Sequence, residues 1–153
     1  MIVASDSTTL IVLFDLEKPE YLTNIFGTIL IPRAVFKELN AKQEVALLKG
    51  FEVVDIKEDE HVELLSKVLD RGESEAIALG IQRNIPLIID EKKGRNIAQN
   101  LGVSILGLLG VIYLNITKGY ISHQEATLFL DDVLRHGFRI APSLINAMLE
   151  RAR

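Results

Sequence analysis

The sequence contains no cysteine in its 153 residues. This absence excludes a disulfide framework, a thiolate zinc site and a cysteine nucleophile, and it fits a reducing compartment such as the cytoplasm. Aromatic residues are scarce, at 6%, and form no regular stripe, so we expect little recognition of nucleobases by stacking. The apolar runs are short and interrupted by glycine, and residues 1–6 carry no basic side chain, so neither a membrane span nor a secretory signal is expected.

The composition is otherwise that of an ordinary globular protein, with 48% hydrophobic and 25% charged residues. The length fits a single domain over residues 1–153. The formal net charge of −4 argues against long-range attraction of nucleic acid. It does not exclude a nucleic-acid substrate, because a bound metal ion can supply the positive charge that the chain lacks.

Short apolar runs alternate with amphipathic stretches along the whole chain. The runs predict strands at residues 2–5, 28–31, 52–56, 86–89 and 103–106. The amphipathic stretches predict helices at residues 8–16, 20–26, 33–49, 59–69, 73–83, 92–100, 107–117, 123–135 and 142–152. The strands are apolar on both faces, which a parallel sheet requires when helices cover both sides, so we expect an α/β fold with right-handed crossovers. The last two helices, within residues 119–153, are expected to form an appended hairpin.

Acidic residues stand directly after two of the expected strands. Asp6 follows the first strand, and Asp90 follows the fourth. Ligands of open parallel sheets bind beyond the carboxyl ends of the strands, at the point where the strand order reverses. If these two strands are neighbours at that point, their carboxylates face each other and need a cation or a shared proton.

Two further carboxylates lie on expected helices near apolar faces. Glu38 stands three residues after Val35 and beside Leu39, on the flank of an inward-facing row. Glu75 lies in the first turn of a helix, where a negative charge is favoured. A cluster made of carboxylate oxygens alone suits Mg²⁺ or Mn²⁺, and such an ion can activate a water and bind a phosphodiester.

Each of these carboxylates also has an ordinary structural explanation. Asp6 could cap the helix that follows it, and Asp90 could belong to a solvated turn. Glu75 could serve only the helix dipole, and Glu38 could be an exposed helix residue. The combination of all four, rather than any one of them, favours a shared site.

Six segments occur in an order that resembles a known family: Val3-Ala4-Ser5-Asp6-Ser7, Ile31-Pro32-Arg33-Ala34-Val35-Phe36-Lys37-Glu38-Leu39, Gly72-Glu73-Ser74-Glu75-Ala76-Ile77, Leu87-Ile88-Ile89-Asp90-Glu91-Lys92-Lys93-Gly94-Arg95, Gly107-Leu108-Leu109-Gly110-Val111 and His136-Gly137-Phe138-Arg139-Ile140. Together they resemble the PIN-domain ribonucleases, a fold of many toxins of toxin–antitoxin pairs. The likeness is to a small prokaryotic subgroup with a Gly-Glu-x-Glu-Ala motif. No single segment is specific, but the ordered set is.

The resemblance implies a five-stranded parallel sheet in the order 3-2-1-4-5, with the first and fourth strands side by side. It implies one catalytic Mg²⁺ or Mn²⁺ site lined by Asp6, Glu38, Glu75 and Asp90. Two neighbouring carboxylates would be further ligands or support these: Glu73 and Glu91. Ser7 matches a family hydroxyl that would hydrogen-bond a carboxylate or a water on the metal.

The resemblance also implies RNA as the substrate, an antitoxin protein as a partner and a homodimer. Lys92, Lys93 and Arg95 follow Asp90 directly and are candidates to contact RNA phosphates, although they could equally form a solvated helix face. Three basic residues are weaker candidates: Arg33, Lys42 and Arg71.

Some positions differ from the family pattern. Leu108 stands where a hydroxyl residue is common, and Asp90 is followed by Glu91 rather than a second aspartate. These differences keep a second hypothesis open, in which the chain is a weakly active or inactive PIN-fold module that binds RNA or a protein. A phosphotransfer protein of the receiver type is disfavoured, because no lysine directly follows the expected strand 103–106.

Overall fold

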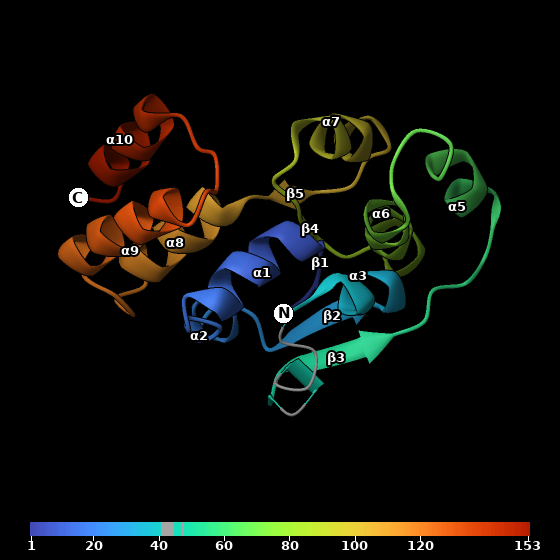
Figure 1. Ribbon diagram of the computed structural model, residues 1–153, viewed down its shortest axis with the longest axis horizontal. Coiled ribbons are helices and arrows are strands. Elements are labelled where there is room, and N and C mark those ends of the chain that lie inside the picture. The colour runs from blue at the N-terminus through green and yellow to red at the C-terminus, as the bar shows by residue number, and fades with distance from the viewer. Residues whose placement is uncertain (41–44, 47) are drawn as a thin grey trace.

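The computed structural model describes residues 1–40, 45–46 and 48–153 (Figure 1). Its centre is a parallel sheet of five strands in the order β3-β2-β1-β4-β5. The strands are β1 (Ile2–Ser5), β2 (Thr28–Pro32), β3 (Phe51–Val54), β4 (Leu87–Ile88) and β5 (Ile105–Leu106). The α/β fold class and the strand order 3-2-1-4-5 are therefore confirmed.

Strand β1 lies at the middle of the sheet and pairs with a strand on each side. Val3 is opposite Ile29 of β2, and Ser5 is opposite Ile88 of β4. The side chains of Val3, Ile29 and Ile88 are fully buried. Burial of apolar side chains from both faces is the main force that holds a parallel sheet between two layers of helices.

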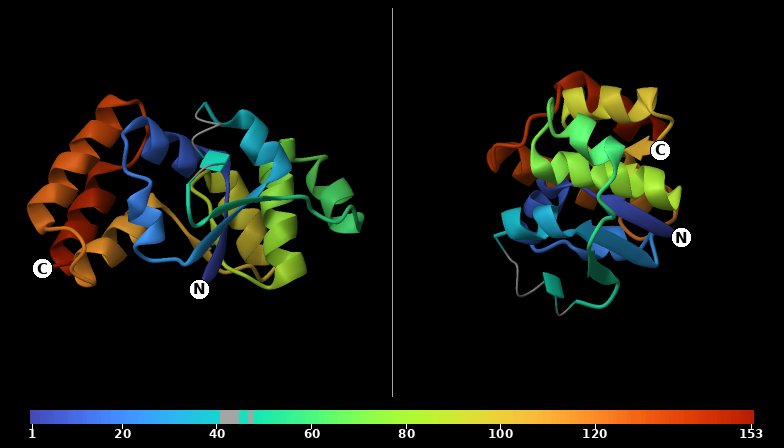
Figure 2. Two further views of the ribbon diagram at one scale, coloured as in Figure 1. Left: turned by 90° about the horizontal axis from the view of Figure 1, so that it is seen from below. Right: turned by 90° about the vertical axis from the view of Figure 1, so that its right-hand side faces the viewer.

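Helices cover the two faces of this sheet. They are α1 (Ser7–Asp15), α2 (Glu20–Thr23), α3 (Arg33–Glu38), α5 (Glu60–Leu65), α6 (Arg71–Arg83), α7 (Lys92–Asn100), α8 (Leu108–Thr117), α9 (His123–Arg135) and α10 (Pro142–Arg151). Figure 2 (left) shows α1 and α2 on one side of the strands and α6 and α7 on the other. Among the helices that the structure describes, none is both long enough and apolar enough to span a bilayer.

The single helix predicted over residues 33–49 is wrong. Helix α3 ends at Glu38, and Leu39 takes an extended conformation with φ −75° and ψ 136°. Leu39 is buried in the core, and the next residue, Asn40, has a low helix propensity. Packing of Leu39 in the core therefore outweighs the helical periodicity of the sequence. Residues 41–44 and 47 of the predicted helix, including Lys42, lie outside the described residues.

The C-terminal helices α9 and α10 form the expected hairpin and pack on the rest of the chain. Figure 1 shows them beside α8 at one end of the molecule. The ring of Phe129 on α9 lies edge-on to Tyr21 of α2, with 4.9 Å between the ring centroids. His136 at the end of α9 lies 3.0 Å from the carboxylate of Asp15 at the end of α1. The hairpin therefore extends the α1–α2 side of the core.

Asn115 of α8 is a polar side chain buried inside this junction. Its amide nitrogen donates to the carbonyl oxygens of Tyr21 and Val111, each at 2.8 Å. Its amide oxygen accepts a hydrogen bond of 3.0 Å from Asn24. These bonds fix α8 against the segment that carries α2.

We predict that Asn115→Ala lowers the free energy of unfolding by about 1–3 kcal/mol, because it leaves the Tyr21 carbonyl and the Asn24 amide without their partner in a buried place. Urea denaturation followed by circular dichroism measures this change. Asn146→Ala is the matched control, since Asn146 is exposed on α10. Equal stabilities of the two variants would contradict the structural role of Asn115.

Candidate active site at the carboxyl ends of the strands

Asp6 and Asp90 lie next to each other at the centre of the sheet. Asp6 follows β1, Asp90 follows β4 by two residues, and these two parallel strands are hydrogen-bonded neighbours. The backbone N–H of Asp6 donates to the carbonyl oxygen of Ile88 at 3.0 Å. The structure thus brings together the two carboxylates that sequence reasoning placed at the reversal of the strand order.

The Asp6 side chain is 2% exposed, and neither of its carboxylate oxygens has a hydrogen-bond partner among the described residues. Asp6 occupies the cap position of α1, but its side chain makes no capping hydrogen bond to that helix. Burial raises the pKa of Asp6 from 3.8 to about 8, and the neighbouring charge of Asp90 adds to this rise. The nearby backbone N–H groups of Thr9 and Asp90 oppose the rise, although neither forms a hydrogen bond of good geometry with the carboxylate. A buried carboxylate of this kind needs a proton or a cation.

The Asp90 side chain is held in a fixed orientation by two groups. The hydroxyl of Thr9 donates to Oδ2, and the backbone N–H of Leu108 at the start of α8 lies 3.0 Å from Oδ1 and 3.2 Å from Oδ2. Burial raises the pKa of Asp90, and these donors together with Arg95 offset part of the rise. A Cβ atom at Gly107 would lie 2.7 Å from Oδ1, so glycine is needed where the chain passes this carboxylate.

Two hydrogen-bond donors to Asp90 are not apparent from the sequence. Thr9 was missed, although it lies one helical turn after Asp6 and its hydroxyl is therefore on the same side of α1. Leu108 replaces a hydroxyl residue that is common in the family pattern. Its backbone N–H nevertheless donates a hydrogen bond to Asp90, and its side chain is fully buried in the core.

Glu38 lies at the end of α3, at the edge of the Asp6–Asp90 pair. Its Oε2 accepts a hydrogen bond of 2.9 Å from the hydroxyl of Ser7, the residue after Asp6. Partial burial is the main cause that raises the pKa of Glu38, and the Ser7 hydrogen bond opposes it. A Cβ atom at Gly72 would overlap Oε1 of Glu38, so this glycine lets the first turn of α6 approach the glutamate.

Glu75 is buried but already has partners. Its Oε2 accepts from Nε of Arg71 at 2.8 Å, and its Oε1 accepts from the backbone N–H of Ala34 at 3.0 Å. Arg71 also forms an ion pair with Glu58. Because α6 begins at Arg71, Glu75 lies in its second turn rather than in the expected first turn, and it connects α6 with the start of α3. In the part of the chain that the structure describes, no three Asp, Glu or His side chains stand in an arrangement that would hold a metal ion.

Glu73 and Glu91 form a second acidic pair between α6 and α7. Burial raises the pKa of Glu73 to about 9, with Glu91 and Asp70 as further causes. The Glu73 Oε2 atom is buried and has no hydrogen-bond partner within residues 1–40, 45–46 and 48–153. Glu91 caps α7 by accepting from the backbone N–H groups of Lys93 and Gly94, and the pKa of Glu91 is lowered, chiefly by Glu73.

The expected phosphate contacts fall into different surroundings. Lys92 and Lys93 are exposed on the first turn of α7. Arg95 turns back toward the sheet, where its Nη1 donates to the carbonyl oxygen of Ile89 at 2.8 Å. Arg33 is paired with Asp55 at 3.1 Å. Arg95 is therefore the expected cation that lies beside the Asp90 carboxylate.

Comparison with known protein families agrees with this architecture. A family model described as a PIN domain matches residues 2–153. The chain belongs to the PIN-domain family. PIN domains are generally nucleases that act on RNA and typically use divalent metal ions, so the chain has a nuclease fold. No curated protein matches the chain.

The pH dependence of stability provides a test of the burial of Asp6. The pKa of Asp6 is about 8 in the folded state and 3.8 in the unfolded chain. The folded protein therefore binds a proton on Asp6 more tightly than the unfolded protein does. The stability of the metal-free protein is therefore expected to fall as the pH rises from about 4 to 8. Asp6→Asn removes the charge, so it is expected to stabilise the protein at pH 8 by a few kcal/mol, since one pKa unit corresponds to about 1.4 kcal/mol.

Urea denaturation in a chelator at pH 5 and pH 8 measures this difference. The increase in the free energy of unfolding that Asp6→Asn causes, relative to the native chain, should be much larger at pH 8 than at pH 5. The matched control is Asp131→Asn, because Asp131 is exposed on α9. A gain that is the same at both pH values would contradict the burial of an unpaired Asp6 carboxylate.

Proposed function

We propose that this PIN domain is a Mg²⁺- or Mn²⁺-dependent endoribonuclease that hydrolyses phosphodiester bonds of RNA. The observation that carries the proposal is the buried Asp6, whose two oxygens lack partners, beside Asp90 where the strand order reverses. Two adjacent carboxylates in a buried place are stable together when a cation lies between them or when one is protonated. Carboxylate oxygens are the ligands that Mg²⁺ and Mn²⁺ prefer.

In this proposal the residues around the ion have different tasks. Asp6 and Asp90 are ligands, and Glu38 and Glu75 line the same site. Thr9 and the Leu108 N–H hold Asp90, Ser7 holds Glu38, and Arg71 holds Glu75. When bound, the ion would lower the pKa of a water molecule and neutralise charge on the phosphate.

The second acidic pair and the basic residues complete the proposed site. Glu73 and Glu91 would act as further ligands. Lys92, Lys93 and Arg95 would contact phosphates of the RNA backbone, because guanidinium and ammonium groups form strong hydrogen bonds with phosphate oxygens.

Two substitutions test the catalytic pair. Asp6→Asn and Asp90→Asn are each expected to lower the cleavage rate of single-stranded RNA by at least about 100-fold, because each removes a charged ligand from the ion. Both should also reduce the rise in melting temperature that Mn²⁺ causes in the native chain. Asp131→Asn should change neither quantity. Full activity of Asp6→Asn, or cleavage that a chelator leaves unchanged, would refute the proposal.

One observation favours a second candidate, a PIN-fold module that binds RNA or a protein with little catalysis. Glu75 is already engaged by Arg71 and Ala34, so one of the four expected carboxylates is occupied within the protein. Glu75→Gln distinguishes the two. A ribonuclease that uses Glu75 would lose cleavage and the Mn²⁺-induced melting shift in this variant, whereas a binding module would show no metal-dependent cleavage before or after the change.

We further propose, from the resemblance alone, that the protein is a homodimeric toxin with an antitoxin partner. The antitoxin would cover the acidic cleft and insert a basic side chain among the carboxylates. Expression of the chain alone should arrest growth, Asp6→Asn should relieve the arrest, and a small neighbouring-gene product should co-purify with the chain. Toxicity that no co-expressed neighbour changes would count against this role.

A further inference from the structure

A cavity of about 400 Å³ lies directly beside the acidic site. One wall comes from the residues after β4 and β5, Asp90 and Gly107, together with Arg95 of α7. The opposite wall comes from the turn between α9 and α10, with Arg139 and Ala141. The cavity therefore joins the proposed cleavage site to the C-terminal hairpin, which is otherwise without a task in the proposed function.

Two guanidinium groups line this cavity. Arg95 is fixed by its hydrogen bond to the carbonyl oxygen of Ile89. Arg139 is exposed, and over the described ranges no carboxylate forms an ion pair with it, whereas Arg33, Arg71 and Arg135 are all paired. In a chain of net charge −4, a guanidinium group without an ion-pair partner beside the acidic site is available to bind an anion.

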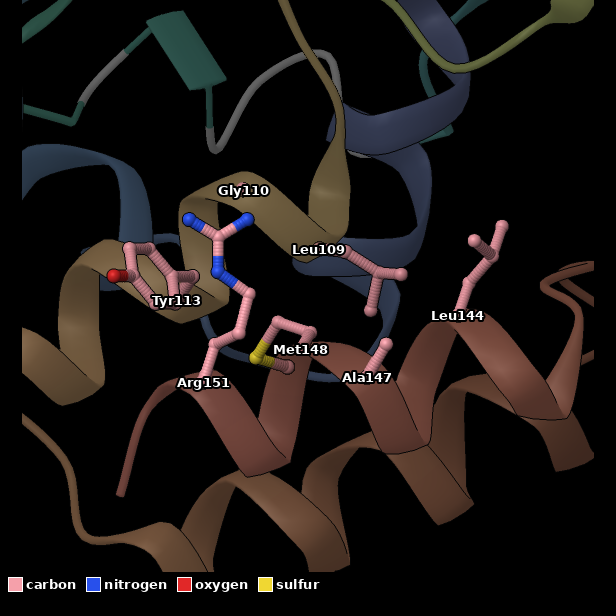
Figure 3. A pocket seen from close by; sticks show the side chains of 7 residues that line it. All are labelled: Leu109, Gly110, Tyr113, Leu144, Ala147, Met148 and Arg151. Carbon is pink, nitrogen blue, oxygen red and sulfur yellow. The ribbon is translucent and has the colours of Figure 1, made fainter.

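The remaining lining of the cavity is apolar. It consists of Ile105, Leu106, Leu109, Ile140 and Leu144, with Gly110 between them. Leu109 and Leu144 also line a second, apolar groove of about 310 Å³. Figure 3 shows this groove between α8 and α10, where Tyr113 comes from α8, Met148 comes from α10 and Arg151 lies over the Tyr113 ring. Each of the two walls of the cavity therefore offers one cation, Arg95 or Arg139, together with apolar contacts.

A nucleotide combines these two chemistries, since its phosphate suits guanidinium groups and its base suits an apolar surface. The volume lies within the range of pockets that bind small organic ligands. An acidic peptide side chain would also suit the arginines, but Asp90 lines the cavity and places it next to the phosphodiester of the proposed reaction.

We propose that this cavity binds one nucleotide of the RNA strand next to the phosphodiester that is cleaved. Arg139 and Arg95 contact the phosphate of that nucleotide, and its base lies against Leu109 and Leu144. This inference rests on the ribonuclease function proposed above. It assigns substrate binding to the C-terminal hairpin and names Arg139 as a residue that binds substrate without contacting the metal site.

Steady-state cleavage of a labelled single-stranded RNA of about 12 nucleotides in Mn²⁺ tests the inference. Arg139→Gln is expected to raise KM by about 3- to 10-fold with little change in kcat, because it removes a charged contact made equally before and during the reaction. The slope of log(kcat/KM) against log salt concentration should become shallower by about 0.7, as for the loss of one phosphate contact. The control Arg135→Gln removes the same charge outside the cavity and should alter neither value.

A second variant separates the effect of the arginine charge from the effect of the cavity's volume. Ala141→Leu keeps both arginines and narrows the cavity, so it is expected to raise KM without altering the salt slope. Fluorescence anisotropy of the same RNA in a chelator, without cleavage, should rank the affinities of the variants in the same order.

The outcomes distinguish this inference from the function on which it rests. If the native chain cleaves RNA and Arg139→Gln behaves like Arg135→Gln, the nucleotide site is wrong and the ribonuclease function stands. If Arg139→Gln keeps its KM for RNA but loses a co-purifying protein, the cavity belongs to a protein partner and the inference is overturned. If the native chain neither binds nor cleaves RNA with any divalent ion, both proposals fail.

Discussion

The burial of Asp6 beside Asp90 is the constraint on which the rest of the site depends. Parallel pairing of β1 with β4 places both carboxylates at one edge of the sheet, and the apolar strands and helices around them exclude water. Burial and the repulsion of like charges both disfavour two ionised carboxylates there. The stability of the apolar core must therefore offset this free-energy cost until a proton or a cation is bound. A feature that weakens the folded state and persists in its centre is typical of a functional site.

Helix α6 shows how two acidic residues of one motif reach different neighbours. Glu73 and Glu75 are two positions apart on a helix, so their side chains leave in different directions. Glu75 reaches the start of α3, where Ala34 and Arg71 hold it, and Glu73 reaches the start of α7, where it meets Glu91. The start of α6 therefore contacts two neighbouring segments around the Asp6–Asp90 pair.

The sequence predicted much of the fold because buried parallel strands are short apolar runs with clear ends. Those ends also located Asp6 and Asp90. The strand order came from the resemblance, since apolar runs do not specify which strands pair. The prediction of a helix over residues 33–49 was wrong because periodicity does not reveal that Leu39 enters the core with an extended backbone. The i, i+4 spacing of Arg71 and Glu75 was a visible signal of their ion pair, whereas Thr9 resembled any residue of a helix's first turn.

Local arrangement of charge, rather than its total, decides how an acidic protein can meet a polyanion. The net charge of −4 repels RNA at long range, and salt at physiological concentration screens this repulsion beyond about 8 Å. At contact distance the nearest groups dominate. Arg95 lies against Asp90, where its charge offsets part of the rise that burial causes in the pKa of that carboxyl, and Arg139 lines the same cavity. A strand that brings one phosphate to the acidic pair would therefore find cations for the next phosphate on the side of the C-terminal hairpin.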